Sequence, residues 1–136
     1  MSQPEFKVRL TLEATLSPSE DPAKVAGALA AVAGLGPDSV SARGESSRLV
    51  SDDPKALVHL RDQLRDRHVR SAARKLLLRD REGRSASLML NRQAAAVGIV
   101  VVCGSPEESP LGPIYLTISS EKLDAVIDWL TAYSVG

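Results

Sequence analysis

A chain of 136 residues can bury a sizeable core in one domain and needs no disulfide or metal to stabilise it. Its 43% hydrophobic and 25% charged residues are typical of a globular protein, and aromatic residues are scarce at 3%. The formal net charge is zero, which argues against a simple polycation. We therefore expect residues 1–136 to form a single domain.

The single cysteine, Cys103, cannot form a disulfide within the chain, which favours a reducing compartment. Cys103 ends a Val-rich run, so we interpret it as a buried side chain rather than a nucleophile. Residues 1–5 lack the basic and apolar regions of a secretory signal. No apolar run reaches the roughly 18 residues that a membrane span needs. The expected location is the cytoplasm, with no membrane partner.

The first half of the chain predicts a strand, a helix and a weaker strand. Apolar residues alternate with polar ones over 6–14, which is the period of a half-buried strand. A capping-box pattern, Ser17 to Glu20, then precedes an Asp-Pro helix start, and glycines near Gly34 end that helix. Residues 38–51 predict a strand interrupted by Gly44.

The helix that begins near Pro54 carries two apolar stripes. Leu57, Leu60 and Leu64 form the first, and the second begins at Val69. At about 100° per residue the second stripe is rotated by roughly 140°, so one straight helix cannot bury both against one layer. The sequence therefore predicts a break or kink at residues 66–69. After that break Arg67, Arg70 and Arg74 are expected to face solvent together.

The second half predicts three strands and a last helix. Alternation over 86–90 predicts a strand, residues 92–96 a bend or bulge, and the continuous apolar run 97–102 a central strand. A proline-containing loop precedes an alternating strand at 114–118, and Ser119-Ser120 caps a final helix. The order is β-α-β-α(kinked)-β-β-β-α. It predicts a two-layer α+β fold with a mostly antiparallel sheet and helices packed on one face.

Charge is distributed unevenly along the chain. Residues 61–92 hold ten basic and four acidic residues, whereas residues 93–136 hold one basic and five acidic residues. Such an excess of positive charge can contact phosphates, although a solvated helix face with internal ion pairs is an equal alternative.

Asn91, Arg92 and Gln93 form a polar triplet between apolar strands. Amide side chains can read base edges, and arginine can stack on bases or contact phosphate. For Asn91 and Gln93, hydrogen bonds to the backbone at a bulge are the simpler interpretation. Arg92 is the better candidate for a ligand contact.

The sequence contains no recognisable catalytic or metal-binding constellation. His59 and His68 have no cysteine or carboxylate at ligand spacing beside them, so zinc binding and RNA hydrolysis are not expected. Adjacent acidic pairs such as Glu107-Glu108 diverge in direction, and no phosphate-binding or nucleophile motif is found. We expect no enzyme activity, no cofactor and no small-molecule substrate.

Five stretches together resemble one known family. They are residues 17–25, the helix at 60–77, Leu90-Asn91-Arg92-Gln93-Ala94-Ala95, Ser109-Pro110-Leu111-Gly112-Pro113-Ile114, and Asp128-Trp129-Leu130. The family consists of small archaeal proteins described as predicted RNA-binding proteins or as a predicted exosome subunit. Its members usually carry lysine at the position of Arg92 and often continue past Leu130 with Ala-Pro. The resemblance implies an archaeal source and an α+β fold similar to that of a ribosomal protein that contacts 5S RNA.

The sequence therefore predicts a non-enzymatic protein that binds structured RNA through a basic helix and the Asn91–Gln93 segment. With few aromatic residues for base stacking, recognition of RNA shape and backbone is expected. The alternative is a protein–protein assembly or homodimerisation module, in which the basic helix of one chain meets the acidic C-terminal segment of another. The predicted RNA contacts are Arg67, Arg70, Arg74, Lys75, Arg92 and Gln93.

Overall fold

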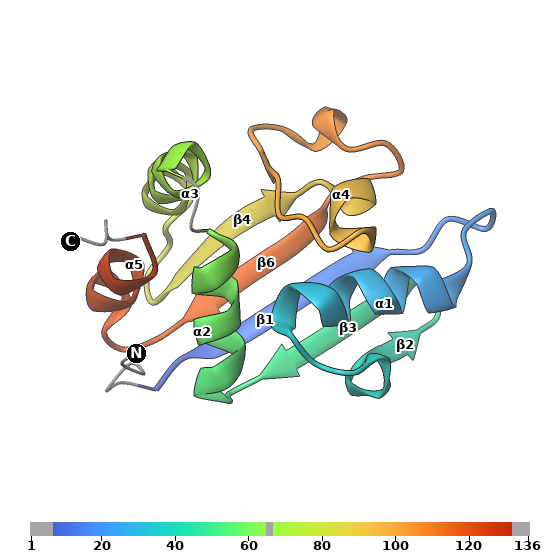
Figure 1. Cartoon of the computed structure of the whole chain (residues 1–136), viewed down its shortest axis with the longest axis horizontal. Helices are drawn as coiled ribbons and strands as arrows, with labels where there is room; N and C mark the ends of the chain where they lie inside the picture. The colour runs from blue at the N-terminus through green and yellow to red at the C-terminus, as the bar shows by residue number, and fades with distance from the viewer. Residues whose placement is uncertain (1–6, 65–66, 132–136) are drawn as a thin grey trace.

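The structure is a computed structural model that describes residues 7–64 and 67–131 (Figure 1). The strands are β1 (Arg9–Thr15), β2 (Ser41–Arg43), β3 (Ser46–Ser51), β4 (Ser85–Leu90), β5 (Val102–Cys103) and β6 (Ile114–Ser119). The helices are α1 (Pro22–Ala33), α2 (Pro54–Gln63), α3 (Arg67–Arg79), α4 (Arg92–Ala96) and α5 (Leu123–Thr131), with short 3-10 helices η1 (Pro37–Ser39) and η2 (Pro106–Glu108).

The six strands form one sheet in the order β2-β3-β1-β6-β4-β5, and every neighbouring pair is antiparallel. The predicted α+β class and antiparallel sheet are therefore confirmed. The central strand β6 runs between β1 and β4 with Leu116 opposite both Leu12 and Leu88. This register aligns the apolar positions of three strands on one face, where they build the core.

One face of the sheet is covered and the other is open. Alternate residues of β1, β4 and β6 are buried, and α1, α2 and α4 lie across this face in Figure 1. The intervening residues point the other way. Among the described residues no helix covers that second face, which we call the open face. Its side chains are mostly polar, as expected for an antiparallel sheet with one solvated side.

Local sequence determines both ends of α1. The Asp21 side chain accepts a hydrogen bond from the Ala23 N–H, and Gly34 ends the helix in the left-handed conformation. The predicted capping box is half formed. The Glu20 carboxylate accepts from the Ser17 N–H, but these two residues make a turn before the helix, and Asp21 is the cap.

The predicted break in the long helix is confirmed. α2 ends at Gln63 and α3 begins at Arg67, and the two helices point in different directions in Figure 1. Of the predicted interval 66–69, residue 66 lies outside the described residues, and residues 67–69 already belong to α3. The two segments bury different stripes, with Leu60 and Leu64 from the first and Ala73 and Leu77 from the second.

Three sequence predictions are wrong in detail. The interrupted strand at 38–51 is a hairpin of β2 and β3, because Gly44 adopts φ +56° and turns the chain back. The apolar run 97–102 is not a central strand. Only its last residue, Val102, belongs to a strand, the two-residue β5 at the sheet edge. Residues 92–96, expected as a bend or bulge, form the helix α4 capped by Asn91, and Gly98 at φ +81° then redirects the chain.

Among the described residues, no helix combines the length and apolar character needed to cross a membrane.

Candidate functional site

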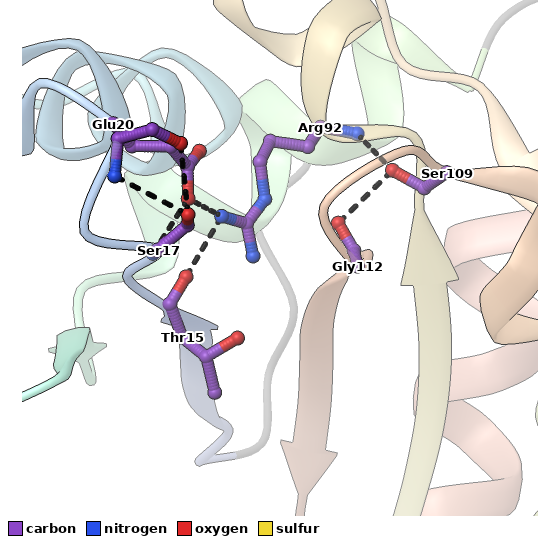
Figure 2. A network of polar contacts seen from close by, with 7 residues as sticks. Thr15, Ser17, Glu20, Arg92, Ser109 and Gly112 are labelled. Atoms are coloured by element: carbon purple, nitrogen blue, oxygen red, sulfur yellow. Dashed lines mark hydrogen bonds and ion pairs between the residues drawn. The ribbon is translucent and has the colours of Figure 1, made fainter.

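Arg92 is the centre of a buried polar network rather than an exposed contact (Figure 2). Its side chain is 5% exposed, and its Nη1 donates to Glu20 Oε1 at 2.6 Å and to the Thr15 carbonyl oxygen at 2.7 Å. The Arg92 N–H donates to the Ser109 hydroxyl, which itself donates to the Gly112 carbonyl oxygen. The network therefore joins the end of β1, the turn before α1, α4 and the loop before β6.

The carboxylate of Glu20 is held in its charged form. Burial opposes ionisation, but the hydrogen bonds from the Ser17 N–H and the Arg92 guanidinium, with the guanidinium charge, outweigh it and lower the pKa of Glu20. Arg92 Nε and Nη2 are buried without a hydrogen-bond partner. A guanidinium enclosed in this way cannot reach an RNA bound at the surface, so we remove Arg92 from the proposed contacts.

The neighbours of Arg92 have separate roles. The Asn91 side chain caps α4 by accepting a hydrogen bond from the Ala94 N–H at 2.9 Å, which agrees with the backbone-binding interpretation. Gln93 is exposed. Three of the stretches that carry the family resemblance, at 17–25, 90–95 and 109–114, meet at the Arg92 network. These three motifs therefore hold separate segments of the fold together, and this structural role explains them at least as well as a binding surface does.

The basic residues of α3 are only partly free to bind a ligand. Arg74 and Lys75 are exposed, Arg70 is half-buried, and the side chain of Arg67 lies outside the described residues. Arg74 Nη1 lies 2.7 Å from Asp128 Oδ1 of α5 and also donates to Thr131. Of the predicted contacts on this helix, the structure thus places Arg74 and Lys75 at the surface.

Much of the charge asymmetry in the sequence is neutralised inside one chain. Besides Arg74–Asp128, Arg81 pairs with Asp124 and Arg84 pairs with Glu121. The acidic C-terminal segment therefore already contacts the basic segment of its own chain. Exposed pairs of this kind contribute about 0–1 kcal/mol, so a phosphate can replace the carboxylate at little cost.

A groove that sequence patterns do not predict lies at the end of the sheet where β1 begins and β6 ends. Its lining includes four basic residues and two acidic ones. These residues come from four separate segments of the chain, which the pairing of β3, β1, β6 and β4 brings together. They are Lys7, Arg9, Asp52, Arg84, Glu121 and Lys122.

His59 contacts the end of α1, and Cys103 lies in the interior of the protein. His59 Nε2 bonds to the Ala31 carbonyl oxygen at 3.0 Å, and its ring packs against Gly34. Cys103 is buried, and burial together with the nearby Glu108 raises the pKa of its thiol. In the described part of the chain, no three His, Cys, Asp or Glu side chains are grouped so that they could hold a metal ion.

The fold and its polar clusters define a two-layer α+β protein with an uncovered sheet face and basic surface residues. No family model matches the chain. A UPF0201 protein of Metallosphaera sedula is 38% identical over 124 residues, which cover 90% of this chain and 86% of the relative. A UPF0201 protein of Sulfolobus acidocaldarius is 34% identical over 125 residues, with the same coverage. The chain therefore belongs to the UPF0201 family.

Solved structures share the fold over nearly the whole chain. The crystal structure of a UPF0201 protein from Methanococcus jannaschii has a TM-score of 0.71 at 20% identity and covers 94% of this chain and 96% of its own. A DUF54 protein from Methanothermobacter thermautotrophicus has a TM-score of 0.64 at 19% identity, covering 93% and 96%. These relatives are archaeal proteins, as the resemblance implied, and none of their names states RNA binding, an exosome role or any other activity.

Proposed function

We propose that this protein binds structured RNA and catalyses no reaction, with the exposed basic side chains of α3 as one contact surface. The observation that carries the proposal is the position of Arg74 and Lys75, which are adjacent and exposed on a well-packed helix. Lys75 forms no ion pair within the described residues, and Arg74 is held by an exposed carboxylate. Both can exchange water or a weak ion pair for a phosphate.

The charge of the whole molecule favours selective rather than general binding of nucleic acid. With no net charge, the protein lacks the long-range attraction of a polycation. Contacts must therefore come from local basic clusters placed on a rigid fold, which suits the shape and backbone of a folded RNA. This agrees with the scarcity of aromatic residues for stacking unpaired bases.

The test is a salt titration of binding to a labelled RNA hairpin with an internal loop. Each lost phosphate contact lowers the slope of log affinity against log salt by roughly 0.7 to 0.9. The double variant R74Q/K75Q should therefore lose about one to two units of slope. The control K24Q/K55Q removes the same charge from the exposed sides of α1 and α2 and should bind like wild type.

No binding of wild type to the RNA at low salt would overturn the proposal. Equal losses in R74Q/K75Q and K24Q/K55Q would show a general charge effect and would remove α3 from the contact surface. The RNA should also remain intact after incubation with the protein, and its cleavage would contradict the absence of catalysis.

A further inference from the structure

The open face of the sheet has three features that together fit a nucleic-acid backbone. A groove with basic side chains lies at one end, rows of hydroxyl groups cross the middle, and an exposed tyrosine lies toward the other end, two strands away from an arginine. Each feature comes from strands that are far apart in sequence, and the antiparallel register aligns them.

The groove places positive charge on both sides of β6. Arg9 of β1 is directly opposite Ser119 of β6, which in turn is opposite Ser85 of β4, the residue after Arg84. Neighbouring strands lie about 4.8 Å apart, so the backbones at Arg9 and Arg84 lie on either side of β6, roughly 10 Å from each other. Lys7 and Lys122 are the other two basic residues of the lining, and neither forms an ion pair with another described residue.

The two acidic residues of the groove do not cancel this charge. Asp52 lies 3.1 Å from Arg9 and Glu121 lies 3.5 Å from Arg84, and all four side chains are at least 63% exposed. Such pairs are worth about 0–1 kcal/mol because water screens them. The groove keeps a net charge of about +2 by this count of its side chains, and phosphates can displace both carboxylates.

The middle of the open face presents hydroxyl groups. Ser85 and Ser119 share a hydrogen bond at 3.0 Å, and Ser87 and Thr117 share one at 3.2 Å. Thr11 is opposite Thr117 and extends the second row. Serine and threonine hydroxyls often bond to phosphate and sugar oxygens in protein–nucleic acid complexes, and the ribose 2′-hydroxyl can bond to the same groups.

The row beyond the hydroxyls carries Tyr115 and Arg48. Tyr115 is 43% exposed and projects from the central strand, where its ring can stack on an unpaired base. Glu13 lies between them in register, opposite both Tyr115 and Arg48. It is the one acidic side chain among these three residues.

We propose that the open face, including the groove formed by Lys7, Arg9, Arg84 and Lys122, is the main surface on which the RNA backbone lies. This inference rests on the proposed function and adds a second surface to the one on α3. The phosphates contact the groove, the sugars contact the hydroxyl rows, and one base stacks on Tyr115.

The test compares double variants that remove equal charge from three places. They are R84Q/K122Q in the groove, R74Q/K75Q on α3, and the control K24Q/K55Q on α1 and α2. R84Q/K122Q should lose about one to two units of salt slope, more than R74Q/K75Q. Tyr115→Leu should weaken binding about fivefold or more by loss of stacking. Backbone amide shifts on addition of the hairpin should concentrate on β1, β4 and β6.

Two outcomes separate this inference from the proposed function. Amide shifts confined to α3, with R84Q/K122Q and Tyr115→Leu binding like wild type, would overturn the open-face assignment and leave RNA binding intact. Failure of wild type to bind the hairpin at low salt would overturn both. Folding of each variant is checked by urea unfolding, where these exposed changes should shift stability by about 0.5 kcal/mol or less.

Discussion

At the scale of single residues, Arg92 shows why chemical type alone does not identify a binding residue. An arginine between apolar segments suggests a ligand contact, but here a carboxylate 72 positions earlier in the sequence is its partner. Residue type and spacing contain no information about that distant pairing. Asn91, by contrast, forms the expected hydrogen bond to the backbone, although as the cap of α4 and not at a bulge, because such a bond depends only on local geometry.

Replacing Arg92 tests its structural role. Arg92→Met should lower the free energy of unfolding by about 3–5 kcal/mol, because Glu20 is left as a buried and unpaired charge. The double variant E20Q/R92M should recover part of that loss. Urea unfolding measures all three proteins. A loss below about 1 kcal/mol in Arg92→Met would match an exposed pair and contradict the burial argument.

The pH dependence of the free energy of unfolding is a second test of the Glu20–Arg92 pair. The folded pKa of Glu20 is lowered, so its contribution is fully present above the unfolded value of about 4.3 and is lost as pH falls through the folded pKa. Wild type should therefore lose stability below about pH 4.3. This part of the acid-side loss should disappear in E20Q/R92M.

At the scale of elements, features set by local sequence are predicted correctly, whereas features that depend on contacts distant in sequence are not. Caps, alternation and the phase change between two apolar stripes located α1, β1, β6 and the α2–α3 break. The prediction of a central strand at 97–102 is wrong because continuous apolar residues indicate burial only on average. Val97 is 73% exposed and Ile99 is 56% exposed, while Asn91 and Gly98 determine the local chain path. The basic groove was unpredictable because its members meet only after strand pairing.

Two glycines, one inside α1 and one at its end, allow a matched test of how backbone conformation affects stability. Gly34 ends α1 at φ +68°, with the N–H groups of Gly34 and Leu35 bonded to carbonyls of the last turn, and an added Cβ would lie 2.6 Å from the His59 ring. Gly34→Ala should therefore destabilise the protein by about 1–2 kcal/mol. Thermal unfolding at several urea concentrations measures the change.

Gly27 is the control, because it lies inside α1 and an added Cβ would meet nothing within 4 Å. Gly27→Ala should stabilise the protein by about 0.5–1 kcal/mol through helix propensity. If both substitutions changed stability in the same direction, the special conformation of Gly34 would not be the cause.

At the scale of the whole molecule, the paired charges of α3 and α5 bear on both candidate functions. The homodimer alternative needs the acidic C-terminal segment of one chain to meet the basic helix of another. In the structure Asp124 and Asp128 already contact Arg81 and Arg74 of the same chain. The same carboxylates compete with any phosphate for those arginines, so they should weaken RNA binding.

The double variant D124N/D128N distinguishes the two functions. It removes two negative charges from exposed pairs, so folding should change by about 1 kcal/mol or less. If RNA is the ligand, the freed Arg74 and Arg81 should raise affinity for the hairpin about three- to tenfold and steepen its salt dependence. If the chain instead assembles through these carboxylates, light scattering should show a smaller mass for the variant than for wild type. An unchanged RNA affinity together with a reduced mass would contradict RNA binding at α3 and favour the assembly function, because the two predictions depend on the same four side chains.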